Sequence, residues 1–365
     1  MSRPSVALGL ALFAAAAPAR AQEVTVIAGG DVLIHRSVAR TAASHAADGG
    51  FGWVLAPLRA ELPDEAVAFA NLETPLSERR RRPGDFRFPI LGADPSLARA
   101  LAGAGFDVVS VANNHAFDQT AEGLYETTEA LHAAGVATAG AGRSDAEAIG
   151  VTVIERRGVR VGVVAFTDHL NASTGHNPHH TFLALASGGA RVAASLRAAR
   201  RRADVVVLSI HWGRDFAYAP TGAQRALARR WVDAGADVIV GTGPHVLQRV
   251  ERVRSPRGDA VVAWSLGNLL SNQGSGYREG APPAPRNDPS ATPFARDGAL
   301  LRVTLERLAD RSIRLRAMEA VPLWTEHADD GSVRASPLRD APPSLRAVRR
   351  RAIARALGPD VTLRH

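Results

Sequence analysis

Short valine-rich runs alternate with Ala-, Leu- and Arg-rich segments along most of this 365-residue chain. The runs have the length and composition of buried strands, and the segments between them have the periodicity of helices. This alternation predicts an α/β fold. The expected strands are residues 24–28, 66–70, 108–111, 205–210, 238–240 and 261–264, and the expected helices are 95–104, 121–134, 188–202, 224–234 and 343–357.

Two regions interrupt the alternation and read as β-hairpins. They are residues 151–166, with a turn at 156–158, and residues 300–322, with a turn at 308–312. Antiparallel pairs beside parallel units favour a mixed sheet or two stacked sheets over one doubly wound sheet. Residues 271–296 are rich in Gly, Pro, Asn and Ser, and they predict a long loop near the functional site.

Composition limits the chemistry that this chain can carry out. The hydrophobic content of 46% is enough for a sizeable core, and the absence of cysteine excludes thiolate catalysis, iron–sulfur clusters and Cys-type zinc sites. A transition metal would have to be bound by His, carboxylate or amide oxygen. The net charge of +8 comes from Arg alone and reflects a compositional bias, so we expect no nucleic-acid partner. The Arg runs at 79–82 and 349–351 read as solvated faces, with contact to a polyanion as the alternative.

The N-terminus has the pattern of a secretory signal peptide. Arg3 precedes an apolar stretch over residues 6–17, and Ala19 and Ala21 form a small-x-small cleavage pattern. We expect residues 1–21 to be a signal peptide cleaved near Ala21, which places the protein outside the cell or in the cell envelope or periplasm. An uncleaved membrane anchor is the alternative, although the stretch is short for a span.

Six expected strands run directly into polar motifs: "VTVIAGGD", "AVAFANLE", "DVVSVANNH", "DVVVLSIHWG", "DVIVGTGPH" and "AVVAWSLGN". Each motif alone could be a turn or a helix cap. However, the carboxyl ends of strands in an α/β sheet meet at one crevice. Together the six motifs supply carboxylates, amides and imidazoles, which are ligands for Mn, Zn or Fe. A carboxylate can also bridge two ions about 3.5–4 Å apart. The residues are Asp31, Asn71, Glu73, Asn113, Asn114, His115, His211, His245 and Asn268.

The motifs "GDVLIH", "NLETPLS", "NNHAFDQT", "HWG", "GPHVLQ" and "SLGNLL" resemble, in order and spacing, those of the CapA family of poly-γ-glutamate capsule synthesis proteins. The resemblance covers residues 24–272. It implies a metallophosphatase-like fold, in which two facing β-sheets are flanked by helices as a four-layer α/β/β/α sandwich. We expect that domain over residues 22–325, followed by a C-terminal extension with a basic helix over residues 326–365.

The same resemblance implies roles for individual residues. One or two divalent ions (Mn, Zn or Fe) would be held, His115 would be the general acid, and Asp118 would orient it. The implied metal ligands are Asp31, Glu73, Asn114, His211 and His245, and the expected substrate-binding residues are Asn71, Arg87, Asp168, His169, Trp212 and Asn268. For Arg87 the alternative is a packed surface side chain, and for Asp168 it is a helix cap. The loop histidines His176, His179 and His180 are expected to be exposed to solvent.

The chain departs from the family pattern just before His245. Many members carry a second His shortly before the one that corresponds to His245, and here Thr242 and Gly243 occupy those places. One ligand of a two-metal site is therefore missing. The expectation is a site that holds one ion, binds a second weakly, or recruits His35, for which a position at a helix start is the alternative.

Such a site could run hydrolysis or group transfer. A metal-bound hydroxide would attack a phosphoryl or acyl centre, and His115 would protonate the leaving group. The resemblance implies a role in the biosynthesis or export of poly-γ-glutamate or a similar anionic cell-surface polymer, together with membrane-bound capsule synthesis proteins. Three alternatives stay open: a non-catalytic protein that binds or exports polymer, a phosphoesterase for small substrates, and a peptide-modifying enzyme. The sequence does not determine the oligomeric state.

Overall fold

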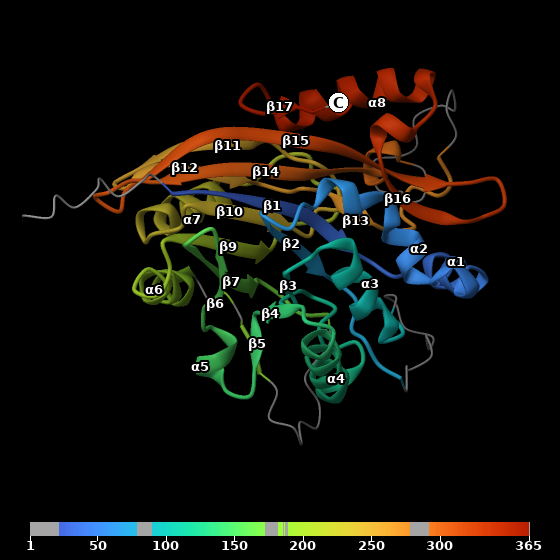
Figure 1. Cartoon of the computed structure of the whole chain (residues 1–365), viewed down its shortest axis with the longest axis horizontal. Helices are drawn as coiled ribbons and strands as arrows, with labels where there is room; N and C mark the ends of the chain where they lie inside the picture. The colour runs from blue at the N-terminus through green and yellow to red at the C-terminus, as the bar shows by residue number, and fades with distance from the viewer. Residues whose placement is uncertain are drawn as a thin grey trace, which may run out of the picture.

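The structure is a computed structural model that describes residues 22–78, 90–171, 182–184, 186, 189–277 and 292–364. The expected signal peptide, the Arg run at 79–82, Arg87 and the three loop histidines lie outside the described residues. Two large β-sheets face each other, with helices packed around them (Figure 1).

The nine-stranded sheet is built around β1 (Gln22–Val32). β1 pairs in parallel with β2 (Val67–Leu72) on one side and antiparallel with β14 (Asp297–Arg307) on the other. Beyond β2 follow β3 (Val108–Ser110) and β4 (Ala137–Ala139), and beyond β14 follow β15 (Ile313–His327) and β16 (Val333–Pro337). Off this path, β13 (Asn268–Leu270) pairs with the end of β1, and β17 (Thr362–Leu363) pairs with β15.

The six-stranded sheet has the order β11-β12-β10-β9-β7-β6. Its four inner strands are parallel, and each outer strand closes a hairpin with its neighbour. The strands are β6 (Thr152–Arg156), β7 (Val159–Thr167), β9 (Val205–His211), β10 (Val238–Thr242), β11 (Val250–Ser255) and β12 (Gly258–Ala263). Two further short strands, β5 (Ala141–Gly142) and β8 (Phe182–Leu183), pair with each other.

Strand β9 illustrates why the sheets stack. All of its residues are buried, and they alternate between two cores because successive side chains point to opposite faces. Val205 and Val207 belong to the core shared with the nine-stranded sheet, whereas Val206 and Leu208 pack in the core beneath α6 and α7. The α/β class and the arrangement of two stacked sheets flanked by helices are thereby confirmed.

The helices lie on the outer sides of the sheets (Figure 1). α6 (Ala190–Ala199) and α7 (Gly222–Asp233) cover the six-stranded sheet. The others belong with the nine-stranded sheet and its core: α1 (Arg36–Ser44), α2 (Phe51–Leu55), α3 (Ser96–Ala104), α4 (Thr120–Ala133) and α8 (Pro343–Leu357). Short turns are α5 (Asp145–Ala148), η1 (Ala46–Asp48), η2 (Ala56–Glu61), η4 (Pro293–Ala295) and η5 (Leu338–Asp340).

The C-terminal residues continue the nine-stranded sheet. β15 runs to His327, β16 and β17 pair with it, and α8 packs against β14. The helix predicted over residues 343–357 is confirmed, but the division of the chain into domains stays a prediction. Among the described residues, no helix is both long and apolar enough to span a membrane.

Candidate metal centre

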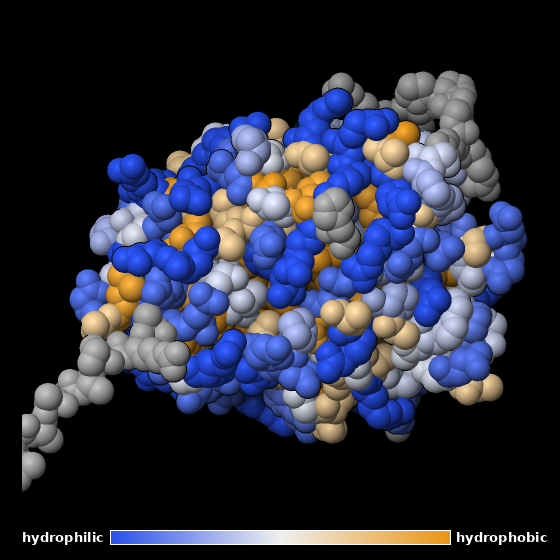
Figure 2. All heavy atoms as spheres, turned by 45° about the horizontal axis from the view of Figure 1, so that its top comes forward, coloured by the Kyte–Doolittle hydropathy of each residue, from blue (hydrophilic) through white to orange (hydrophobic). Residues whose placement is uncertain are grey.

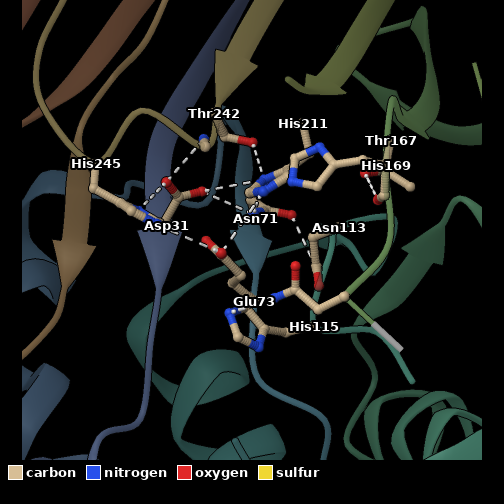
Figure 3. Close-up of polar contacts among 12 residues, drawn as sticks. Asp31, Asn71, Glu73, Asn113, His115, Thr167, His169, His211, Thr242 and His245 are labelled. Carbon is tan, nitrogen blue, oxygen red and sulfur yellow. Dashed lines mark hydrogen bonds and ion pairs between the residues drawn. The ribbon is translucent and has the colours of Figure 1, made fainter. Parts of the chain in front are cut away.

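Sheet register brings the polar strand ends together. Asp31 at the end of β1 lies opposite Asn71 of β2, and His211 at the end of β9 lies opposite Thr242 of β10. Since the two sheets face each other, the ends of β1 and β2 meet those of β9 and β10 (Figure 3). The expected convergence of strand ends therefore occurs across the two sheets.

Three of the expected ligands form a compact buried group. One ligand atom from each of Asp31, Glu73 and His211 lies within 4.8 Å of the other two. Oε1 of Glu73 is 3.6 Å from Nε2 of His211 and 3.7 Å from Nε2 of His245. Glu73 is held there because its backbone N–H donates to the carbonyl oxygen of Val32 in β1.

Glu73 supplies the test of whether a cation fits this site. Its side chain is fully buried, yet neither carboxylate oxygen has a hydrogen-bond partner. Burial and then the nearby charge of Asp31 raise the pKa of Glu73 well above its usual value. The two imidazoles lie 3.6 and 3.7 Å away, beyond hydrogen-bonding distance, and a buried carboxylate without a hydrogen-bond donor is costly unless a cation compensates it. The carboxylate and imidazole donors here therefore fit a divalent transition metal.

Asp31 is the most constrained of these ligands. Its Oδ1 accepts a hydrogen bond from Nδ2 of Asn71 (2.8 Å), and its Oδ2 accepts one from the backbone N–H of Gly243 (3.1 Å) and lies 3.2 Å from Nδ1 of His245. Burial alone would raise the pKa of Asp31, but His245, His211 and Asn71 hold it below its usual value. Asp31 is therefore a fixed anion.

The Gly-Pro bend after β10 aims His245 at the site. Gly243 and His245 both have positive φ, 107° and 56°, and for a non-glycine residue this conformation is strained. The bend places Nδ1 of His245 against Asp31 and Nε2 toward Glu73. Burial lowers the pKa of His245, but the hydrogen bond and the charge of Asp31 outweigh burial, so that the net shift is upward.

His211 is held as a neutral ring. Burial lowers its pKa to about 3, and Nδ1 lies 3.1 Å from Oγ1 of Thr242, which is also fully buried. Nδ1 also lies 3.4 Å from Nδ2 of Asn71, and Nε2 faces Glu73 on the other side of the ring. Such a hydrogen bond on the far nitrogen orients metal-binding histidines in general.

His115 and Asp118 form a buried pair, as expected. Nδ1 of His115 is 2.6 Å from Oδ2 of Asp118, and the same oxygen accepts a hydrogen bond from the backbone N–H of Leu91 (2.7 Å). The other ring nitrogen, Nε2, lies 3.4 Å from Nδ2 of Asn171. The contact with Asp118 thus fixes the orientation of the ring.

The remaining expected residues fall into different surroundings. Oδ1 of Asn114 is buried without a hydrogen-bond partner, as suits an amide ligand. Nδ2 of Asn268 donates to the carbonyl oxygen of Ala295 (2.8 Å), so this side chain braces the backbone. Trp212 is buried in the core beneath α6 and α7, stacked between Trp231 and Trp264.

Asp168 and His169 lie at the half-exposed edge of the centre. Their side chains pair with each other, and this contact raises the pKa of His169. The backbone N–H of Asp168 donates to the carbonyl oxygen of His211 (3.0 Å), which fixes the pair beside a candidate ligand.

His35 lies close to the centre without being part of the ligand group. Burial, followed by the charges of His245 and His115, lowers its pKa to about 4. Its Nδ1 accepts a hydrogen bond from the backbone N–H of Asn272 (3.2 Å), and it occupies the N-cap position of α1. His35 therefore stands at the start of a helix, which was the alternative to recruitment as a metal ligand.

Sequence reasoning missed two residues near the centre. Asn171 contacts His115, and the negative charge of the exposed Asp215 acts on both Glu73 and His245. Asn171 lies two residues after His169, and Asp215 lies two residues after the motif "HWG". Neither follows an apolar strand directly, which was the signal that revealed the others.

Comparison with known proteins places the centre within a matched region. The family model described as bacterial capsule synthesis protein PGA_cap matches residues 25–273. The capsule biosynthesis protein CapA of Bacillus anthracis is 29% identical over 258 residues, which is 69% of this chain and 61% of that protein. The PGA biosynthesis protein CapA of Bacillus subtilis strain 168 is 30% identical over 246 residues, 67% of this chain and 62% of that protein. The match thus spans less than two thirds of these relatives.

Solved structures with a similar arrangement include a phosphatase from Mycoplasma pneumoniae, with a TM-score of 0.46 and 14% identity, covering 83% of this chain and 94% of that chain. The NAD nucleotidase of Haemophilus influenzae has a TM-score of 0.44 and 10% identity, covering 95% of this chain and 58% of that chain.

Proposed function

This chain belongs to the bacterial capsule synthesis protein family PGA_cap, and on that premise we propose that it is an exported, divalent-metal-dependent hydrolase or transferase. Its substrate would be poly-γ-glutamate or a similar anionic polymer or peptide of the cell envelope. The observation that carries the proposal is the buried Asp31, Glu73 and His211 group, in which both oxygens of Glu73 lack a hydrogen-bond partner.

The ligand roles follow from the donors. Asp31, Glu73, His211 and His245 would hold the ion, with the buried Oδ1 of Asn114 as a further ligand. A divalent ion in such a setting lowers the pKa of bound water and polarises a phosphoryl or acyl oxygen. Thr242, in the place of a family histidine, would orient His211 instead of binding metal.

His115 would move the proton at Nε2. The contact between Nδ1 and the Asp118 carboxylate fixes the ring, and Nε2 would donate a proton to the leaving group. Asn171 lies 3.4 Å from that nitrogen and would position it or the substrate. At the half-exposed edge, Asp168 and His169 would contact the substrate. Arg87, which lies outside the described residues, would grip a carboxylate or phosphate.

The setting that we propose is the cell envelope. The family description and the Bacillus relatives name capsule and PGA biosynthesis, which fits export by the N-terminal segment and work beside membrane-bound capsule synthesis proteins.

Elemental analysis and activity of the full chain test the proposal. Wild type, loaded with Mn, Zn or Fe in turn, is expected to retain near-stoichiometric metal and to act on poly-γ-glutamate or on an aryl phosphate. Asp31→Asn and His211→Ala should lose the metal, and His115→Ala should keep the metal but lose about 10²- to 10⁴-fold in turnover. His132→Ala, on the exposed side of α4, is the matched control and should change neither.

Two outcomes contradict the proposal in different ways. A wild-type protein that binds no metal after addition would remove the metal centre. Full metal occupancy without turnover, together with unchanged polymer production by His115→Ala cells, would instead indicate a non-catalytic polymer-binding protein.

A further inference from the structure

A second recessed site lies beside helix α8, far along the chain from the expected metal ligands. It is a cleft of about 380 Å³ between α8, the adjoining part of β15 and η5. We call it the arginine cleft, after Arg339, Arg346, Arg350 and Arg364, which line it. All of its lining residues fall within residues 321–364, outside the region that the family model matches.

Among the described residues, two of these arginines have no carboxylate partner. Arg339 pairs with Glu61, and Arg364 pairs with Glu319 at 3.3 Å. In the part of the chain that the structure describes, Arg346 and Arg350 form no ion pair. The arginine cleft therefore keeps about two uncompensated positive charges.

Backbone carbonyl groups hold these two guanidinium groups in place. Arg346 donates to the carbonyl oxygen of Arg339 (2.9 Å), and Arg350 donates to those of Arg364 (2.7 Å) and Leu363 (3.0 Å). A guanidinium has five N–H donors, so both keep donors for a ligand. Because their side chains are already ordered, binding an anion costs less conformational entropy.

The floor of the arginine cleft is apolar. Val321 and Leu338 line it and are each only 2% exposed. Figure 2 shows the face that carries α8, where hydrophilic side chains surround small apolar areas. Arginines above an apolar floor suit a chain in which carboxylates alternate with methylene groups, because both parts of the ligand find a match.

We propose that the arginine cleft binds carboxylate groups of an anionic polypeptide, as a polymer-holding site separate from the metal centre. The proposal rests on the proposed function for the identity of that polymer. A recessed cleft favours a single chain over a membrane surface, against which the outward-facing Arg351 and Arg355 would be better placed. Phosphate offers arginine the same bidentate geometry as carboxylate, so the test includes it.

Binding of labelled poly-γ-glutamate to the full chain, followed by fluorescence anisotropy at fixed ionic strength, tests the arginine cleft. Arg346→Ala combined with Arg350→Ala is expected to weaken binding by about tenfold or more, since charge-assisted hydrogen bonds are lost. Arg351→Ala combined with Arg355→Ala removes the same charge from the same helix and should weaken binding less than about twofold. Replacement of Arg346 and Arg350 by Lys should restore part of the affinity.

Several results would contradict the proposal that the arginine cleft binds an anionic polypeptide. Equal weakening in both double variants would indicate non-specific attraction to a basic protein. Stronger competition by polyphosphate than by unlabelled polymer would indicate a phosphate site, and loss of binding to phosphatidylglycerol vesicles alone would indicate a membrane contact.

Metal analysis of the same proteins separates the two proposals. If the variant with Arg346→Ala and Arg350→Ala binds polymer normally while Asp31→Asn does not, the proposal for the arginine cleft is wrong and the proposed function stands. A wild-type protein that binds polymer through the cleft but takes up no metal would overturn the proposed function and leave the cleft.

Discussion

The resemblance to the CapA family implies an imidazole in the place of Thr242 or Gly243, and we propose a different task for the Thr242 hydroxyl. The hydroxyl lies 3.1 Å from Nδ1 of His211, fully buried at the end of β10. A hydroxyl is a weak metal ligand but a good partner for a ring nitrogen. In this proposal Thr242 acts on the metal centre through His211, and the other expected donors keep their places.

Replacing Thr242 by Val keeps the shape of the side chain and removes its hydrogen bond to His211. We expect metal affinity to fall by about 10- to 100-fold, as for other residues that orient a ligand, measured by calorimetric titration of metal into apoprotein. Ser209→Ala is the matched control, because Ser209 is a buried hydroxyl of the same sheet without a hydrogen-bond partner. Equal losses in the two variants would contradict the role assigned to Thr242.

His35 makes stability depend on pH. Its folded pKa of about 4 lies below the usual value of 6.5, so the stability that the neutral ring contributes is present above pH 6.5 and is lost as pH falls toward 4. Protonation also removes the Nδ1 lone pair that accepts from Asn272. Relative to His35→Asn, wild type should lose up to about 3 kcal/mol of unfolding free energy between pH 7 and 4, measured by urea denaturation. A pH-independent difference would count against this.

For single residues, the sequence predicted which polar side chains gather at the centre better than it predicted what each of them contacts. Polar residues after buried strands were visible in the sequence, because strand ends meet in this class of fold. Which amide braces and which one faces a cation depends on rotamers and on neighbours across the two sheets. Nδ2 of Asn71 donates to Asp31 and Nδ2 of Asn268 donates to the backbone, whereas Oδ1 is without a hydrogen-bond partner in both Asn114 and Asn268.

Among the elements, the bend after β10 is sensitive to substitution and also touches the candidate metal centre. A Cβ added at Gly243 would lie 2.8 Å from the carbonyl oxygen of Trp212 and 3.3 Å from the ring of His211, at a φ of 107°. Gly243→Ala should cost about 1–3 kcal/mol of unfolding free energy and weaken metal binding, because the Gly243 N–H donates to Asp31. Denaturation with and without metal would show both effects.

Gly103→Ala is the contrasting change. Gly103 lies in α3, and an added Cβ would meet nothing within 4 Å. Here we expect up to about 1 kcal/mol of stabilisation, from the higher helix propensity of Ala. If both glycine substitutions had the same sign, the strain assigned to the bend would be wrong.

Strands with a strong apolar pattern were predicted well, whereas strands with several charged residues were missed or predicted too short. The hairpin over residues 151–166 is confirmed as β6 and β7, and that over residues 300–322 as the longer β14 and β15. β11 was missed because its sequence VERVRS mixes charged residues with Val, and only its first residue is fully buried. Its partner β12 is longer than predicted for the same reason.

At the scale of the whole molecule, one buried ion pair attaches α8 to the sheet. Arg349 is 4% exposed and Asp297 2%, and Nε of Arg349 donates to Oδ1 of Asp297 at 3.0 Å. Arg349 belongs to a run that read as a solvated face, and this reading was wrong for it. The sequence could not show this, because Asp297 lies 52 positions away.

Arg349→Ala leaves Asp297 buried without its partner. We expect a loss of about 3–5 kcal/mol in unfolding free energy, whereas Arg351→Ala on the exposed side of α8 should stay within about 0.5 kcal/mol. Adding Asp297→Asn to the first variant should recover part of the loss. Equilibrium denaturation of the variants measures all three, and no recovery in the double variant would contradict the ion-pair explanation.

The unpartnered carboxylate of Glu73 ties metal loading to the acidity of the surroundings. Burial and the charge of Asp31 raise the pKa of Glu73, so a proton competes with an arriving cation for its carboxylate. Loading should therefore release protons, and the heat of binding should vary with the ionisation enthalpy of the buffer. A fall in pH would then lower the metal occupancy of the centre by mass action, without any change in the supply of metal.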